Sequence, residues 1–94
     1  MKRDRILASY DIREPRRLRR VAKTMEAYGS RVQYSVFVCD LSLRELVDLK
    51  EELRSILKPE DSVMFVALGA GYETSCFEFM GSRRGLPTAG SVIV

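Results

Sequence analysis

Histidine and tryptophan are absent from this chain, and cysteine occurs only twice, at Cys39 and Cys76. Without histidine, hydrolysis by an activated side-chain nucleophile has no obvious machinery, and Ser35, a conceivable nucleophile, has no neighbour of a type that would activate it. The two cysteines lack metal-site spacing and have no histidine to complete such a site. We therefore expect both to be reduced and to behave as small hydrophobic residues.

The chain also has no apolar run of about 18 residues, so we expect no membrane partner. Its first five residues, Met1-Lys2-Arg3-Asp4-Arg5, lead into a strand pattern without a signal-peptide cleavage region. Together these absences predict a cytoplasmic protein. A length of 94 residues predicts a single domain, residues 1–94, for which one core is only marginally sufficient, so a partner subunit is a reasonable expectation.

Positive charge is concentrated in the first third of the chain. Residues 1–31 contain ten of the sixteen basic residues against four acidic ones, a net charge of +6, while residues 32–94 carry six basic and nine acidic residues, a net charge of −3. Most of the ten are arginines, whose planar guanidinium matches the geometry of phosphate. The asymmetry predicts a pole that attracts phosphate groups, and the alternative is a helix face whose arginines are merely solvated.

The first part of the chain reads as a strand, a helix and a strand region. Residues 5–12 alternate in polarity, which places Tyr10 on the apolar face of a strand and Asp11 on the opposite face. Pro15 suits the first turn of a helix, whose apolar stripe runs to Tyr28 and which Gly29 ends. Residues 31–39 predict either one strand or two short strands folded at about positions 34–35.

The second part predicts a helix and further strands. Ser42 and Glu45 form a capping box, which opens a helix with a stripe extending through Leu57 and ending at Pro59. Residues 63–68 are continuously apolar, which predicts a strand covered on both faces or lying at a subunit interface. Residues 74–79 are a plausible further strand, and residues 81–91 read as a loop. The order of elements predicts a ferredoxin-like α+β sandwich, with an antiparallel sheet and both helices on one face.

Three sequence blocks resemble the small CRISPR-associated endonuclease family, the dimeric partner of the spacer-acquisition integrase. The blocks are Tyr10-Asp11-Ile12, the helix from Arg17 to Lys23 with Tyr28-Gly29, and Arg31-Val32-Gln33 followed by Ser35-Val36-Phe37, with a weaker match at Asp61-Ser62-Val63. The resemblance extends to about Gly69 and implies the same ferredoxin-like fold, with a core at about residues 4–69. It leaves residues 70–94 as an extension, with extra strand character, that we expect to dock on the partner subunit.

Asp11 is the candidate catalytic and metal-binding residue. It stands at a strand end among arginines, which either neutralise it or hold a polyanion over it. Mg²⁺, or another divalent cation such as Mn²⁺, binds one or two carboxylates and activates water without a protein base. One aspartate alone is a poor site, and the resemblance implies that two copies of Asp11 meet across the two-fold axis of a homodimer. An ion pair between Asp11 and an arginine is the alternative.

Other residues are candidates for binding or support. The candidate nucleic-acid contacts are Arg16, Arg17, Arg20 and Arg31. Arg31, beside a turn, suits phosphate contact or charge stabilisation, although a salt bridge to Asp11 would use the same geometry. Tyr10, Ser35 and Phe37 are possible supporting residues. Tyr10 and Phe37 are more simply explained as core, with base stacking as the alternative for Phe37.

Two functions from different classes fit these observations. The resemblance implies a metal-dependent endonuclease acting on RNA or DNA, or a non-catalytic scaffold that bridges integrase dimers and holds the DNA to be inserted as a CRISPR spacer. A third reading is a toxin-like small ribonuclease outside CRISPR defence. The expected partners are a second copy of the chain, integrase subunits and nucleic acid, in the cytoplasm of a prokaryote. The apolar end, residues 92–94, is expected to add an edge strand to the partner's sheet.

Overall fold

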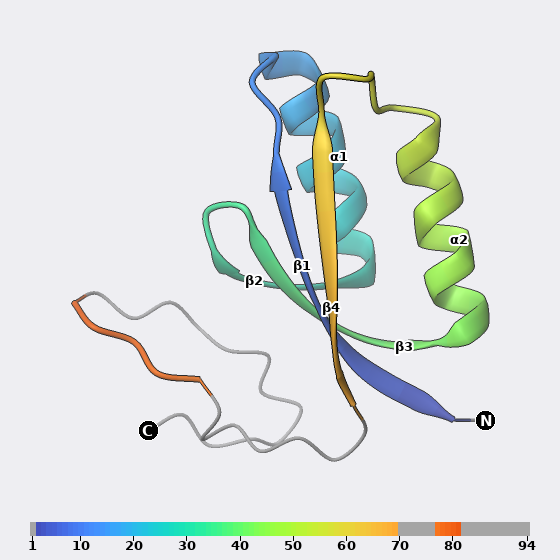
Figure 1. The fold of residues 1–94 in the computed structure, drawn as a ribbon, viewed down its shortest axis with the longest axis vertical. Helices are drawn as coiled ribbons and strands as arrows, with labels where there is room; N and C mark the ends of the chain where they lie inside the picture. The colour runs from blue at the N-terminus through green and yellow to red at the C-terminus, as the bar shows by residue number, and fades with distance from the viewer. Residues whose placement is uncertain (1, 70–76, 82–94) are drawn as a thin grey trace.

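The computed structural model describes residues 2–69 and 77–81 (Figure 1). The elements, in chain order, are β1 (Arg3–Asp11), α1 (Pro15–Tyr28), β2 (Gly29–Gln33), β3 (Val36–Ser42), α2 (Leu43–Arg54) and β4 (Ser62–Gly69). The four strands form one antiparallel sheet in the order β2-β3-β1-β4. Both helices pack on the same face of this sheet. The predicted ferredoxin-like α+β fold is therefore confirmed.

The core lies between the two helices and the sheet. Ile6, Ala8 and Tyr10 on β1 are buried, as the alternation predicted, whereas Asp11 is exposed on the opposite face. From the helices, the buried side chains are Val21, Met25, Leu49 and Leu53. The alternation thus places the Asp11 carboxylate on the face of β1 opposite its buried side chains. No helix in the described part of the chain is long and apolar enough to cross a membrane.

Helix α1 begins and ends at the residues that the sequence indicated, and Gly29 follows it directly. Pro15 occupies the first turn, and the N-cap is Glu14. Gly29 is the first residue of β2 and has an extended φ of −161°, not a left-handed one. A Cβ at this position would lie 2.5 Å from Sγ of Cys39 and 2.7 Å from the carbonyl oxygen of Val38. The close approach of β3 therefore requires glycine here.

Residues 31–39 form two strands, β2 and β3, joined by a turn at Tyr34 and Ser35. The carbonyl of Ser35 accepts a hydrogen bond from the backbone N–H of Tyr10 at 3.1 Å. Phe37 on β3 faces the helices, and Val38 lies in a separate cluster with Val32. The hairpin turn is thus attached to β1 at the residue that precedes Asp11.

The predicted capping box of the second helix is confirmed, because Ser42 and Glu45 exchange both of its hydrogen bonds, but the helix ends at Arg54. Ile56 and Leu57, which were expected within the helix, instead follow it in a turn, where both backbone N–H groups bond to the carbonyl of Leu53.

Strand β4 is an edge strand with one covered face. Val63 and Phe65 pack against the core under the helices, whereas Met64 and Val66 are 55% and 40% exposed. Coverage of both faces is therefore not found within the described residues, and the alternative, a subunit interface, stays a prediction. Residues 77–81 form no strand, although Phe77 and Phe79 pack beside Val32. The predictions for residues 70–76 and 82–94 lie outside the described residues.

Candidate functional site

Asp11 lies at the end of β1, on the face of the sheet opposite the helices. It is exposed and pairs across the sheet with Ser62, the first residue of β4. Directly opposed residues of antiparallel strands point their side chains to the same face, so the Ser62 hydroxyl shares this end of the sheet with the carboxylate. Asp11 also borders a surface pocket of about 460 Å³, and the other lining residues are Arg13, Glu14, Arg17, Glu60 and Asp61.

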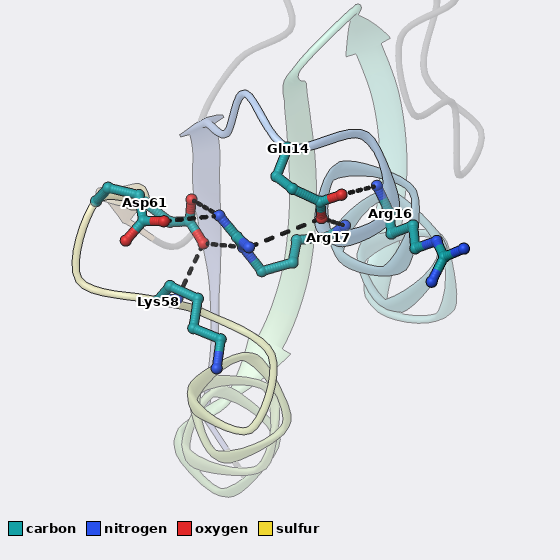
Figure 2. Close-up of polar contacts among 6 residues, drawn as sticks. Glu14, Arg16, Arg17, Lys58 and Asp61 are labelled. Atoms are coloured by element: carbon teal, nitrogen blue, oxygen red, sulfur yellow. Dashed lines mark hydrogen bonds and ion pairs between the residues drawn. The ribbon is translucent and has the colours of Figure 1, made fainter.

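Arg17 and Asp61 form the most tightly held ion pair of this pocket. Arg17 Nε donates to Asp61 Oδ2 at 2.7 Å, and Nη2 donates to Oδ1 at 3.2 Å. Asp61 also accepts the backbone N–H of Lys58 at 2.9 Å, and its side chain is 1% exposed. Figure 2 shows the guanidinium facing this carboxylate from the first turn of α1. The hydrogen bonds from Arg17, and then that from Lys58, lower the pKa of Asp61.

Two further carboxylates contact Arg17. Nη2 donates to Glu60 at 3.1 Å, and Nη1 lies 3.7 Å from Glu14. Glu14 at the same time accepts the backbone N–H groups of Arg16 and Arg17, which lowers its pKa and caps α1. A phosphate would compete with these carboxylates for Arg17. Contact with phosphate stays a prediction for Arg17, whose guanidinium is already bound.

The arginines of the pocket do not neutralise Asp11. Within residues 2–69 and 77–81, Asp11 takes part in no ion pair; Arg17 is bound to other carboxylates, and Arg13 forms no ion pair either. No cluster of three or more potential metal ligands occurs among the described residues either. Mg²⁺ accepts one or two carboxylates and fills its other positions with water. The exposed carboxylate of Asp11 fits one such ligand position.

Several basic side chains in and just before α1 have no ion-pair partner among the described residues. Among residues 13–28, five exposed basic residues form no ion pair, namely Arg13, Arg16, Arg19, Arg20 and Lys23. Arg16, Arg20 and Lys23 have the i, i+4, i+7 spacing of one helix face. This face is opposite Val21 and Met25, which are buried. The helix therefore presents a row of unneutralised positive charge to solvent.

Arg31 is bound within its own hairpin and helix. It donates to the carbonyl of Tyr34, and its Nη2 lies 3.6 Å from Oε2 of Glu26 on α1. Its guanidinium carbon is 5.0 Å from the ring centroid of Phe37. The carboxylate partner of Arg31 is thus Glu26 and not Asp11. Contact with phosphate stays a prediction for its partly exposed side chain.

The aromatic supporting candidates lie in the core. Phe37 is 0% exposed, and its ring stacks on Tyr10 at a centroid distance of 6.2 Å. Burial raises the pKa of Tyr10, although the nearby Arg31 acts in the opposite direction. The core interpretation of both residues is confirmed, and Phe37 offers no free ring face to a base. Ser35 contributes its backbone carbonyl, which holds the turn against β1.

The role of Asp61 was not recognised from the sequence. It appeared there only as part of a family match at the start of a strand. Its partner, Arg17, is 44 residues away and is one of many arginines. Sequence spacing alone does not indicate which arginine will pair with a given acid. An acid directly before an apolar strand is nevertheless a sequence pattern that could have drawn attention to Asp61.

The comparisons with known proteins agree on one family. The model of the family described as CRISPR associated protein Cas2 matches residues 4–75. A CRISPR-associated endoribonuclease Cas2 from Synechocystis sp. is 40% identical over 87 residues, covering 92% of this chain and 94% of the relative. A CRISPR-associated endonuclease Cas2 from Halalkalibacterium halodurans is 39% identical over 84 residues, covering 83% and 86%. The crystal structure of Streptococcus pyogenes Cas2 matches with a TM-score of 0.75 and 37% identity, covering 82% of this chain and 99% of that chain.

Proposed function

This chain belongs to the CRISPR-associated Cas2 family, and from that premise we propose that it is a divalent-metal-dependent endonuclease that hydrolyses phosphodiester bonds of RNA or DNA. The relatives named above are an endoribonuclease and an endonuclease, which supports nuclease activity but leaves the substrate open. The observation that carries the proposal is the exposed carboxylate of Asp11, which has no cation partner among the described residues and shares its pocket with the unpaired Arg13. We propose that it acts in the cytoplasm of a prokaryotic cell.

In this proposal, Asp11 holds Mg²⁺ or Mn²⁺, and the unpaired cations of α1 hold the nucleic-acid backbone. A bound divalent ion would supply a hydrolytic water and a positive charge against the phosphate. Arg16 and Arg20 would contact phosphates elsewhere along the strand, because they are exposed and unpaired on the helix that follows Asp11. The burial of Tyr10 and the bond from its N–H to Ser35 keep the end of β1 in place.

The test is the metal dependence of cleavage. RNA and DNA strands of the same sequence are incubated with the protein over a range of Mg²⁺ concentrations, with and without excess EDTA. We expect cleavage that rises with Mg²⁺ and stops in EDTA. An Asp11→Asn protein purified in parallel reports contaminating nucleases. Cleavage by the wild type that persists in EDTA would contradict the metal assignment.

We propose a homodimer as the active form. Met64 and Val66 on the open face of the sheet are exposed apolar side chains, and the outer edge of β4, residues 62–69, contains no charged residue to discourage pairing. A second copy covering this face would bring two copies of Asp11 toward one another. Sedimentation of a chain shortened by residues 91–94 should show a weakened dimer, and an unchanged dimer would separate the apolar terminus from dimerisation.

A second candidate function is a DNA-binding scaffold that joins integrase subunits during spacer acquisition. It is favoured by the number of unpaired cations on α1, which exceeds what one scissile phosphate needs. Integration assays with the integrase distinguish the two functions. An Arg16→Gln, Arg20→Gln double variant should weaken integration, and Asp11→Asn should leave it intact if the scaffold is the biological role. Loss of integration in the Asp11 variant alone would make cleavage the role.

A further inference from the structure

Arg17 and Asp61 lie at the site but bind each other. We infer that they are positioning residues for the proposed nuclease, and that their ion pair fixes the place of the Asp11 carboxylate at the end of β1. The inference rests on the proposed function, because it takes Asp11 as the metal ligand. It gives Arg17 a different task from the other arginines of α1.

The ion pair joins the two segments that flank Asp11. On one side, the chain runs from Asp11 through a short connection into α1, and Arg17 lies in the first turn of that helix. On the other side, Asp61 directly precedes Ser62, which pairs with Asp11 across β1 and β4. Arg17 and Asp61 therefore connect the segment after Asp11 to the strand beside it. All three side chains line the same pocket.

The contacts of Asp61 are directional as well as ionic. Its two oxygens receive Nε and Nη2 of Arg17 in a side-on, bidentate arrangement, and the N–H of Lys58 orients the carboxylate further. Bidentate pairing adds geometric specificity that a single charge contact does not provide. Figure 2 shows Arg17 reaching this carboxylate from α1, while Lys58 bonds to it from within the loop before β4. Such a pair resists rotation of the loop and of the strand start that it precedes.

The consequence for catalysis concerns geometry and not affinity. A displacement of about 1 Å at a reacting group can reduce the rate by about a hundredfold, even when its cause lies outside the reacting groups. Loss of the Arg17–Asp61 pair should therefore lower kcat. Nucleic-acid affinity should change little, because the unpaired cations, Arg16, Arg20 and Lys23 among them, are retained.

The test compares Asp61→Asn and Arg17→Lys with a matched control, Asp40→Asn. Asp40 also pairs with arginine, at 3.7 Å from Arg3 and 3.9 Å from Arg5, but it lies near the opposite end of β1. At a temperature where circular dichroism shows every variant folded, we expect Asp61→Asn to lower kcat by roughly tenfold to a hundredfold, with KM within about twofold of the wild type. Arg17→Lys keeps the positive charge, so its kcat should fall less than that of Asp61→Asn. The kcat of Asp40→Asn should match that of the wild type.

Three results would overturn the inference. The first is an unchanged kcat in folded Asp61→Asn and Arg17→Lys. The second is a raised KM or weakened binding with kcat unchanged, which would make Arg17 a direct nucleic-acid contact. The third is an equal loss of kcat in Asp40→Asn, which would indicate a general effect of lost stability. If Asp61→Asn does not fold, Arg17→Lys decides the question alone.

A second readout does not depend on cleavage. Mn²⁺ added to isotope-labelled protein broadens amide signals close to the bound ion. We expect broadening around Asp11 in the wild type, and a weaker or displaced effect in Asp61→Asn. Cleavage by Asp11→Asn at the wild-type rate would refute the proposed function itself, and so would wild-type protein with neither cleavage nor broadening. An inactive Asp11→Asn beside a fully active Asp61→Asn would refute the positioning role alone.

Discussion

Arg16 and Arg20 should control the salt dependence of duplex binding, whereas Arg17 should not. All three belong to the first half of α1, but only Arg17 is bound by carboxylates in the described structure. A cation that is already neutralised by protein releases few counter-ions from DNA. Comparing variants of Arg16 and Arg20 with a variant of Arg17 therefore distinguishes arginines that are free to bind phosphate from an arginine that is already paired within the protein.

The size of the effect follows from counter-ion release. Each phosphate contact contributes about −0.9 to the slope of log K against log salt concentration on duplex DNA. The Arg16→Gln, Arg20→Gln double variant should therefore have a slope flatter by about 1.8. Over a fourfold rise in salt concentration, the wild type should lose roughly tenfold more affinity than the double variant.

Fluorescence anisotropy of a labelled duplex, titrated at several salt concentrations, measures these slopes. Arg17→Gln is the matched control on the same helix, and Arg44→Gln tests an exposed arginine that pairs with Asp48 on α2. Both controls should keep the wild-type slope. The reasoning is refuted if Arg17→Gln flattens the slope as much as Arg16→Gln does, or if the double variant keeps the wild-type slope.

Three further predictions concern the fold. Gly29→Ala should lower the free energy of unfolding by about 1–3 kcal/mol, because the added methyl meets Cys39 and the backbone of β3, and an unchanged denaturation midpoint would contradict the close approach. Arg17 lowers the pKa of Asp61 below its ordinary 3.8, so the ionised carboxylate stabilises the fold above about pH 4 and the contribution is lost as the pH falls through the lowered value. Asp61→Asn should therefore be less stable than the wild type at neutral pH, and the difference should narrow below about pH 4; a constant difference between neutral and acid pH would argue against the ion pair. Burial raises the pKa of Cys39 to about 11, so peptide mapping after brief treatment with iodoacetamide at neutral pH should find Cys39 unmodified, and rapid labelling would mean that the thiol is accessible.

Local signals in the sequence predicted the elements of the fold well. The alternation around Tyr10 identified the buried face of β1, and the exchange between Ser42 and Glu45 identified the start of α2. Each of these signals depends only on residues a few positions apart, so it can be recognised without knowing the three-dimensional fold. The position of Asp11 at an exposed strand end followed directly from the same alternation.

Pairings between distant residues could not be predicted in this way. The arginines of α1 have similar local contexts, and only the three-dimensional fold brings Arg17, and not Arg16, to Asp61. Gly29 was expected to end a helix, and the structure adds a reason that the sequence did not give, the proximity of Cys39 on another strand. Arg31 similarly selects Glu26, a partner on α1. Sequence reasoning therefore predicted the exposed position of Asp11 but not the partner of each charge around it.

The most direct test of the central claim, that the Asp11 carboxylate holds the catalytic metal, is the cleavage rate of Asp11→Asn at saturating nucleic acid and Mg²⁺. Asparagine keeps the size of the side chain and removes its charge, and Asp11 is exposed, so the fold should be retained. We predict a fall in rate of at least about a hundredfold, with nucleic-acid affinity within about twofold of the wild type. Cleavage by the purified variant at the wild-type rate would contradict it.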